Sequence, residues 1–125
     1  MSQERVLVVD DEVYILHILD FILGAESYEV VTATDGEQAL QRVREDKPDL
    51  VILDIMMPKL DGYETCRIIK SDEATKHIPV ILLTAKGREI DQKLGEEVGA
   101  SDYITKPFSP TKLIERVQSI LGVRR

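Results

Sequence analysis

The chain alternates between short apolar runs and longer stretches with helical periodicity. About a dozen residues of helical pattern separate successive runs, which is typical of βαβ units. The runs are rich in Val, Ile and Leu on both faces, as parallel strands covered on both sides are. Strands are therefore predicted at Arg5–Val9, Glu29–Ala33, Leu50–Leu53, Val80–Leu83 and Asp102–Ile104. The second run alternates more between apolar and polar residues, which favours an edge of the sheet.

Capping residues and helix breakers mark five predicted helices. Asp61 followed by Glu64 has the pattern of a capping box, and Ser109 followed by Pro110 is an N-cap and first-turn pair. Glycine suits the left-handed turn after a helix, whereas proline cannot continue a helix. The helices are expected at about 12–23, ending at Gly24; from Asp35–Gly36 to before Pro48; from Asp61 onward; at about 88–98, ending at Gly99; and from Ser109 to near Gly122.

Right-handed crossovers restrict how such units are arranged. The leading topology is an α/β fold, a flavodoxin-like (βα)5 doubly wound parallel sheet of strand order 2-1-3-4-5. Its switch point lies between the first and third strands, where open sheets bind ligands at the carboxyl ends of the strands. A chain of 125 residues is near the commonest domain size, so we expect residues 1–125 to form one domain.

Composition and charge argue against several classes of function. The formal net charge of −7 and the pI near 4.8 argue against direct nucleic-acid binding and suit a domain with protein partners. Cys66 is the single cysteine, so no internal disulfide can form. Met1–Arg5 is too short and polar for a secretory signal, and no apolar run approaches a membrane span. We expect a cytoplasmic protein that does not bind a membrane.

Polar residues follow four of the predicted strands. Asp10 and Asp11 follow the first strand, Asp54 the third, Thr84 the fourth, and Lys106 the fifth. Because the carboxyl ends of parallel strands lie along one edge, these side chains should share one crevice. Three clustered carboxylates disfavour each other's ionisation, and a divalent cation relieves this repulsion. The donors are hard oxygens with no histidine nearby, so Mg²⁺, or alternatively Mn²⁺, fits best.

Asp54 is a candidate nucleophile toward phosphorus, since a carboxylate can form an acyl phosphate. A metal on one side and Lys106 on the other would clamp the transferred oxygens, with the Thr84 hydroxyl bonding a third. Each residue also has an ordinary alternative. Asp10 and Asp11 can cap the first helix, Thr84 can cap a helix, Lys106 can be a surface lysine, and Asp54 can precede a turn.

Five short motifs together resemble the receiver domain of bacterial two-component response regulators. They are V-D-D-E at 9–12, L-D-I-M-M-P at 53–58, D-G at 61–62, L-T-A at 83–85 and D-Y-I-T-K-P-F at 102–108. The motifs occur in the family's order and spacing, and the resemblance covers essentially the whole chain. It implies a single receiver domain over residues 1–125, without an effector domain in this chain.

The resemblance implies a role for each matching residue. Asp54 corresponds to the phosphoacceptor, and the metal ligands are Asp10, Asp11, Asp54 and the backbone carbonyl of Met56. Thr84 corresponds to the switch hydroxyl, and Lys106 to the lysine that pairs with the phosphoryl group. Tyr103 corresponds to the aromatic residue that reports phosphorylation, and Pro107 to a proline preceded by a cis peptide bond.

The implied function is a signalling switch and not a conventional enzyme. A sensor histidine kinase, a histidine phosphotransfer protein or acetyl phosphate would phosphorylate Asp54 with Mg²⁺, and the domain would catalyse only this step and slow dephosphorylation. The surface formed by the fourth helix, fifth strand and fifth helix would then change and control a downstream protein or output domain. Met56 and Lys86 stand where relatives carry groups that orient water, so a long-lived phosphoryl group is expected.

Two groups of residues are candidates for protein docking. The first helix carries Tyr14, Ile15 and Ile18 in excess of one buried stripe, and these residues either face a histidine donor or belong to a broadly buried helix. Asp102 and Arg116 match an intersubunit ion pair of transcription-factor-type regulators. Lys112 and Leu94 depart from that class, which favours a monomer or a weak dimer.

Two rival functions are weighed against the switch. A haloacid-dehalogenase-like phosphatase also forms an aspartyl phosphate with Mg²⁺, but it needs an acid two residues after its nucleophile, where this chain has Met56. A flavodoxin-type nucleotide-binding module needs a Gly-rich phosphate loop after the first strand, where this chain has Asp10, Asp11 and Glu12.

Overall fold

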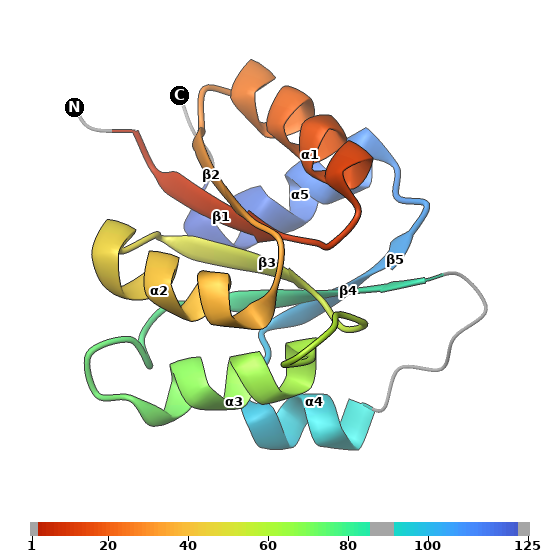
Figure 1. Ribbon diagram of the computed structural model, residues 1–125. Coiled ribbons are helices and arrows are strands. Elements are labelled where there is room, and N and C mark those ends of the chain that lie inside the picture. The colour runs from red at the N-terminus through yellow and green to blue at the C-terminus, as the bar shows by residue number, and fades with distance from the viewer. Residues whose placement is uncertain (1–2, 86–91, 123–125) are drawn as a thin grey trace.

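The computed structural model describes residues 3–85 and 92–122, and within these ranges five parallel strands alternate with five helices (Figure 1). The strand order is β2-β1-β3-β4-β5, which confirms the predicted doubly wound topology. The strands are β1 (Arg5–Val9), β2 (Glu29–Ala33), β3 (Leu50–Asp54), β4 (Val80–Ala85) and β5 (Asp102–Lys106). The helices are α1 (Val13–Ala25), α2 (Gly36–Asp46), α3 (Gly62–Ser71), α4 (Gln92–Val98) and α5 (Pro110–Leu121).

The sheet separates two hydrophobic layers. Helices α1 and α5 cover one face, and α2, α3 and α4 cover the other (Figure 1). Alternation along β1 divides its side chains between them: Val6 and Val8 join the layer under α1 and α5, and Leu7 and Val9 join the opposite layer. All four are fully buried, as are the apolar residues of β3. The central strands are therefore packed on both faces, whereas β2 lies at an edge as predicted.

Most predicted helix ends are confirmed. Asp35, Asp61 and Ser109 each accept a hydrogen bond from a backbone N–H in the first turn of the helix that follows. The capping box at Asp61 is only half formed, because Glu64 pairs with Arg67 at 3.0 Å. Helix α4 ends before Gly99, whose φ is +87°. Its predicted start at Arg88 lies outside the described residues.

The first helix departs from the prediction at its C-terminal end. It begins at Val13 and continues through Gly24 to Ala25, so Gly24 does not end it. Ser27 takes the left-handed conformation instead, with φ +68°. The Tyr28 N–H bonds back to the Leu23 carbonyl at 3.1 Å, which closes the turn without a glycine and directs Tyr28 into the core.

None of the described helices is both long and apolar enough to cross a membrane.

Candidate functional site

The strand register brings the predicted site residues to one edge of the sheet. Val9 lies opposite Leu53 in the β1–β3 pair, so Asp10 and Asp54 continue neighbouring strands past the same level. Leu83 is the register partner of Asp54, and Thr84 is the next residue of β4. Thr84 in turn pairs with Thr105, directly before Lys106. Strands β3, β4 and β5 each extend slightly further than predicted, so Asp54, Thr84 and Lys106 lie within the strands.

Glycine at position 62 fixes the first turn of α3 against the end of β3. The Gly62 N–H donates to the Ile55 carbonyl at 2.9 Å. A Cβ atom at Gly62 would lie 2.3 Å from the Asp54 carbonyl oxygen, well inside van der Waals contact. The close approach of α3 to the backbone of Asp54 therefore requires a residue without a side chain.

The three predicted acidic residues form a cluster. One carboxylate oxygen from each of Asp10, Asp11 and Asp54 can be chosen so that all three lie within 4.8 Å of one another. Asp10 is fully buried, Asp54 is 4% exposed, and Asp11 is exposed to solvent. These oxygens form the hard donor set that Mg²⁺ prefers, with an open side for water or phosphate. The residues present therefore fit the predicted metal.

Burial makes the ionised form of two of these carboxyls costly. Desolvation, followed by repulsion from Asp10, raises the pKa of Asp54 to about 6, although Lys106 and the backbone N–H of Met56 oppose the shift. Desolvation also raises the pKa of Asp10, against the opposing effects of the Glu12 backbone and Lys106. The cluster therefore carries negative charge that the protein leaves incompletely compensated.

Lys106 enters this cluster from β5. Its ammonium lies 3.0 Å from Asp10, 3.6 Å from Asp54 and 3.5 Å from Glu12, and its side chain is 13% exposed. Burial alone would lower the pKa of Lys106, but the hydrogen bond and charge of Asp10 together with the charges of Asp54 and Glu12 outweigh burial, so the pKa is raised. The lysine is therefore charged at neutral pH, and the peptide bond between it and Pro107 is cis, as predicted.

An open cleft of about 340 Å³ gives solvent access to these groups, and Asp11, Glu12, Asp54, Met56, Ala85 and Lys106 line it. Met56 is 51% exposed and is the most accessible apolar side chain among them. Thr84 is 3% exposed beside the cleft. Lys86, the other predicted tuning residue, lies outside the described residues.

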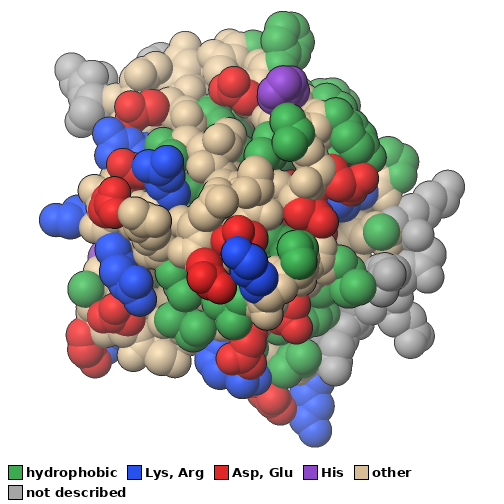
Figure 2. Space-filling view, viewed as in Figure 1, with side chains coloured by type: hydrophobic (Ala, Val, Ile, Leu, Met, Phe, Trp, Pro, Cys, Tyr) green, Lys and Arg blue, Asp and Glu red, His purple; other side chains and the backbone are tan. Residues whose placement is uncertain are grey.

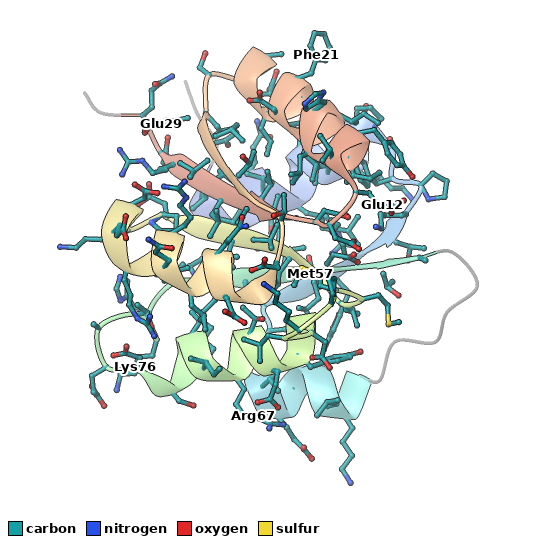
Figure 3. All side chains as sticks on the ribbon, in the orientation of Figure 1. Glu12, Phe21, Glu29, Met57, Arg67 and Lys76 are labelled. Atoms are coloured by element: carbon teal, nitrogen blue, oxygen red, sulfur yellow. The ribbon has the colours of Figure 1, made fainter. Side chains whose placement is uncertain are left out.

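Glu12 is a site residue that the sequence analysis did not single out. Its backbone N–H donates to Asp10 at 2.9 Å, and its carboxylate accepts a hydrogen bond from the Tyr14 hydroxyl at 2.9 Å. Figure 3 labels Glu12 beside the loop that joins β1 to α1. Its position directly after the Asp10–Asp11 pair was a signal for its presence at the edge.

The residues predicted to dock partners divide into exposed and buried ones. Tyr14 and Ile18 are 59% and 44% exposed on α1. Ile15 is 8% exposed and packs in the core under α1, so the expectation that it faces a partner is corrected. Phe21, which the prediction omitted, is 79% exposed and continues the helical spacing from Tyr14 and Ile18. Figure 2 shows hydrophobic side chains gathered in this region, and Figure 3 shows Phe21 pointing away from the sheet.

The predicted site residues Asp102, Tyr103 and Arg116 lie on β5 and α5 and make different contacts. Arg116 of α5 donates to Asp102 of β5 at 2.9 Å, so this pair forms within the chain. Tyr103 is half-buried and packs against the layer formed by α2, α3 and α4. Of the predicted site residues, Tyr103, Asp102 and Arg116 thus lie on β5 and α5 outside the lining of the acidic cleft.

The fold and the cleft together define a CheY-like α/β domain with an acidic site at its switch point. Residues 6–118 match the family model of the response regulator receiver domain. The chain belongs to this family, whose members are signalling switches of two-component systems.

Similar proteins agree with this assignment. The chain is 48% identical over 118 residues to the alkaline phosphatase synthesis transcriptional regulatory protein PhoP of Bacillus subtilis, covering 94% of the chain and 48% of that protein. It is 50% identical over 120 residues to the transcriptional regulator ycf27 of Guillardia theta, covering 96% of the chain and 46% of that protein. The chain thus spans about half the length of the curated relatives it matches.

Solved structures show the same fold. A response regulator from Chloroflexus aurantiacus superposes with a TM-score of 0.91 at 38% identity, covering 98% of this chain and all of that chain. The receiver domain of the sensor histidine kinase PA1611 from Pseudomonas aeruginosa has a TM-score of 0.88 at 29% identity and covers 98% of this chain and 100% of its own. That structure has a magnesium ion coordinated in its active-site cleft.

The raised pKa of Asp54 predicts a pH-dependent effect of Asp54→Asn. A carboxyl whose pKa rises from 3.8 to about 6 on folding stabilises the protein fully below pH 4 and loses this contribution as the pH rises through 6. In EDTA, the neutral amide should therefore raise the free energy of unfolding at pH 7.5 by on the order of 2 kcal/mol more than at pH 4.

Urea unfolding at the two pH values measures this difference. Asp20→Asn, at an exposed position on α1, is the matched control and should show no comparable pH dependence. An equal effect of Asp54→Asn at pH 4 and pH 7.5 would show that the Asp54 carboxyl is not costly to ionise.

Proposed function

We propose that this receiver domain is switched by phosphorylation of Asp54. The observation that carries the proposal is a buried carboxylate at an open cleft, with an ammonium 3.6 Å away and two further acids beside it. An oxygen of the Asp54 carboxylate would attack phosphorus. The bond from phosphorus to the donor's histidine nitrogen, or to the acyl oxygen of a small acyl phosphate, would break. The product is an acyl phosphate on Asp54.

The neighbouring side chains have separate roles in this transfer. The Lys106 ammonium would pair with a transferred oxygen, and the Thr84 hydroxyl would hydrogen-bond another. Asp10, Asp11, Asp54 and the carbonyl of Met56 would hold Mg²⁺, with Mn²⁺ as a possible substitute. When bound, the metal supplies positive charge that offsets the charge of the carboxylates and the phosphoryl group. The magnesium ion in the related PA1611 receiver domain supports this assignment.

The proposed phosphoryl donor is a sensor histidine kinase, a histidine phosphotransfer protein or a small acyl phosphate such as acetyl phosphate. A protein donor would dock on the exposed Tyr14, whose hydroxyl bonds the cleft residue Glu12, and on Ile18, one turn further along α1. We propose that the domain catalyses only its own phosphorylation and slow dephosphorylation.

The proposed output surface is formed by α4, β5 and α5. Movement of Thr84 toward the phosphoryl group would change the packing available to Tyr103, which biases this surface between two states. A downstream protein or output domain would read the change. The acidic domain itself is not proposed to bind nucleic acid, although its relatives are transcriptional regulators. Because Lys112 and Leu94 depart from the pattern of the dimerising transcription-factor-type regulators, we propose a monomer or a weak dimer.

Incubation with acetyl phosphate and Mg²⁺ tests the proposal. Intact-protein mass spectrometry should show addition of one phosphoryl group to the wild-type chain, its loss in EDTA, and its absence in Asp54→Asn. Asp20→Asn is the matched control and should be phosphorylated like the wild type. An undiminished adduct in Asp54→Asn, or no adduct with several small donors, would overturn the assignment.

Met56 predicts a long-lived phosphoryl group, because its exposed thioether cannot orient a water molecule for attack. Met56→Asn places an amide at the mouth of the cleft and should accelerate loss of the phosphoryl group several-fold. Met56→Leu keeps an apolar side chain and should decay at nearly the wild-type rate. The rates are measured by mass spectrometry after the donor is removed, and an unchanged rate in Met56→Asn would argue against this role of position 56.

A further inference from the structure

Tyr103 projects from β5 onto the backbone of α4. A Cβ atom at Gly95 would lie 2.0 Å from the Tyr103 hydroxyl oxygen and 2.7 Å from both Cε1 and Cζ of the ring. Carbon atoms in contact normally lie about 3.5–4.0 Å apart. The ring therefore occupies space that any residue with a side chain at position 95 would fill.

The Tyr103 ring packs within the protein, against the hydrophobic layer under α3 and α4. Tyr103 packs against the same hydrophobic layer as Leu94, Val98 and Tyr63. Desolvation, followed by the nearby charge of Glu96, raises the pKa of the Tyr103 hydroxyl. The hydroxyl thus lies beside α4 and close to α3, and the ring fills the junction between β5 and α4.

Glycine at this position has a conformational cost. Gly95 is buried and lies in the middle of α4 as described, where glycine is less favourable than alanine. Gly24 in α1 offers a contrast, because a Cβ atom there would meet no atom within 4 Å. Helix propensity favours alanine at both positions, and the contact with a tyrosine ring distinguishes Gly95.

We propose that Gly95 is a positioning residue that forms the seat of the Tyr103 ring, and that occupancy of this seat couples β5 to α4. A methyl group at position 95 displaces the ring, because a tyrosine side chain moves more readily than the backbone of a packed helix. The steric part of the inference is independent of phosphorylation. The coupling part rests on the proposed function, since it makes departure from the seat the step by which phosphorylated Asp54 alters the α4–β5–α5 surface.

The direction in which an alanine at position 95 shifts the urea midpoint of unfolding tests whether the Tyr103 ring occupies this space. Gly95→Ala should lower the urea midpoint of unfolding in the wild-type background. In a Tyr103→Ala background the same substitution should raise the midpoint, because the space is vacant and alanine favours the helix. Gly24→Ala is the matched control and should not lower the midpoint in either background.

The alternative outcomes are distinct. If Gly95→Ala raises the midpoint equally in both backgrounds, the ring does not occupy the seat and the inference is wrong. If Gly95→Ala fails to fold while the double variant folds, the steric conflict is confirmed, because removal of the ring restores the protein.

A spectroscopic readout tests the coupling. The ring signals of Tyr103 in a protein with ¹³C-labelled tyrosine are identified by their loss in Tyr103→Ala. Gly95→Ala without any phosphoryl donor should shift these signals in the direction that acetyl phosphate and Mg²⁺ shift them in the wild type. Unchanged ring signals in Gly95→Ala would contradict the seat. A shift in Gly95→Ala combined with no shift in wild-type protein shown by mass to be phosphorylated would overturn the coupling alone, and no phosphorylation at all would overturn the proposed function.

Discussion

The burial of Asp10 and Asp54 beside Lys106 is the interaction on which the site depends. Two carboxyls that are almost inaccessible to solvent lie next to one ammonium, which is closer to Asp10 than to Asp54. Because burial raises the pKa of both acids, the protein maintains a site whose charge is incompletely neutralised. Such a site favours added positive charge and can exchange one set of ionic partners for another. These properties suit the reversible phosphorylation proposed for Asp54.

The rest of the fold keeps these charges together. Buried apolar residues hold β1 and β3 in register, and Gly62 lets α3 begin directly against the backbone of Asp54. Lys106 reaches the same edge from β5, and Tyr103 of the same strand packs against Gly95 of α4. One strand therefore carries both the group that contacts the acids and the ring that contacts α4.

Much of this architecture could be predicted from the sequence, because strand periodicity and capping residues act locally. The alternation of apolar runs with helical patterns predicts the sheet, and the acidic residues at the strand ends predict the acidic cleft. Contacts between distant elements could not be predicted in the same way. The local pattern favours a helix end at Gly24, but α1 continues to Ala25 and Ser27 makes the turn. Likewise, only the packing of α1 on the sheet shows that Ile15 is buried. The role of Gly95 depends on a ring from another element, which no local pattern reveals.

The effect of Mg²⁺ on stability tests the central claim of an undercompensated acidic cluster most directly. A ligand that binds the folded state raises the free energy of unfolding by RT ln(1 + [L]/Kd), so the thermal midpoint at pH 7.5 should rise steadily as Mg²⁺ is titrated. Asp11→Asn removes an exposed carboxylate of the cluster and should largely abolish the rise, whereas Asp20→Asn should retain it. A midpoint that does not respond to Mg²⁺, or that responds equally in Asp11→Asn, would contradict the account.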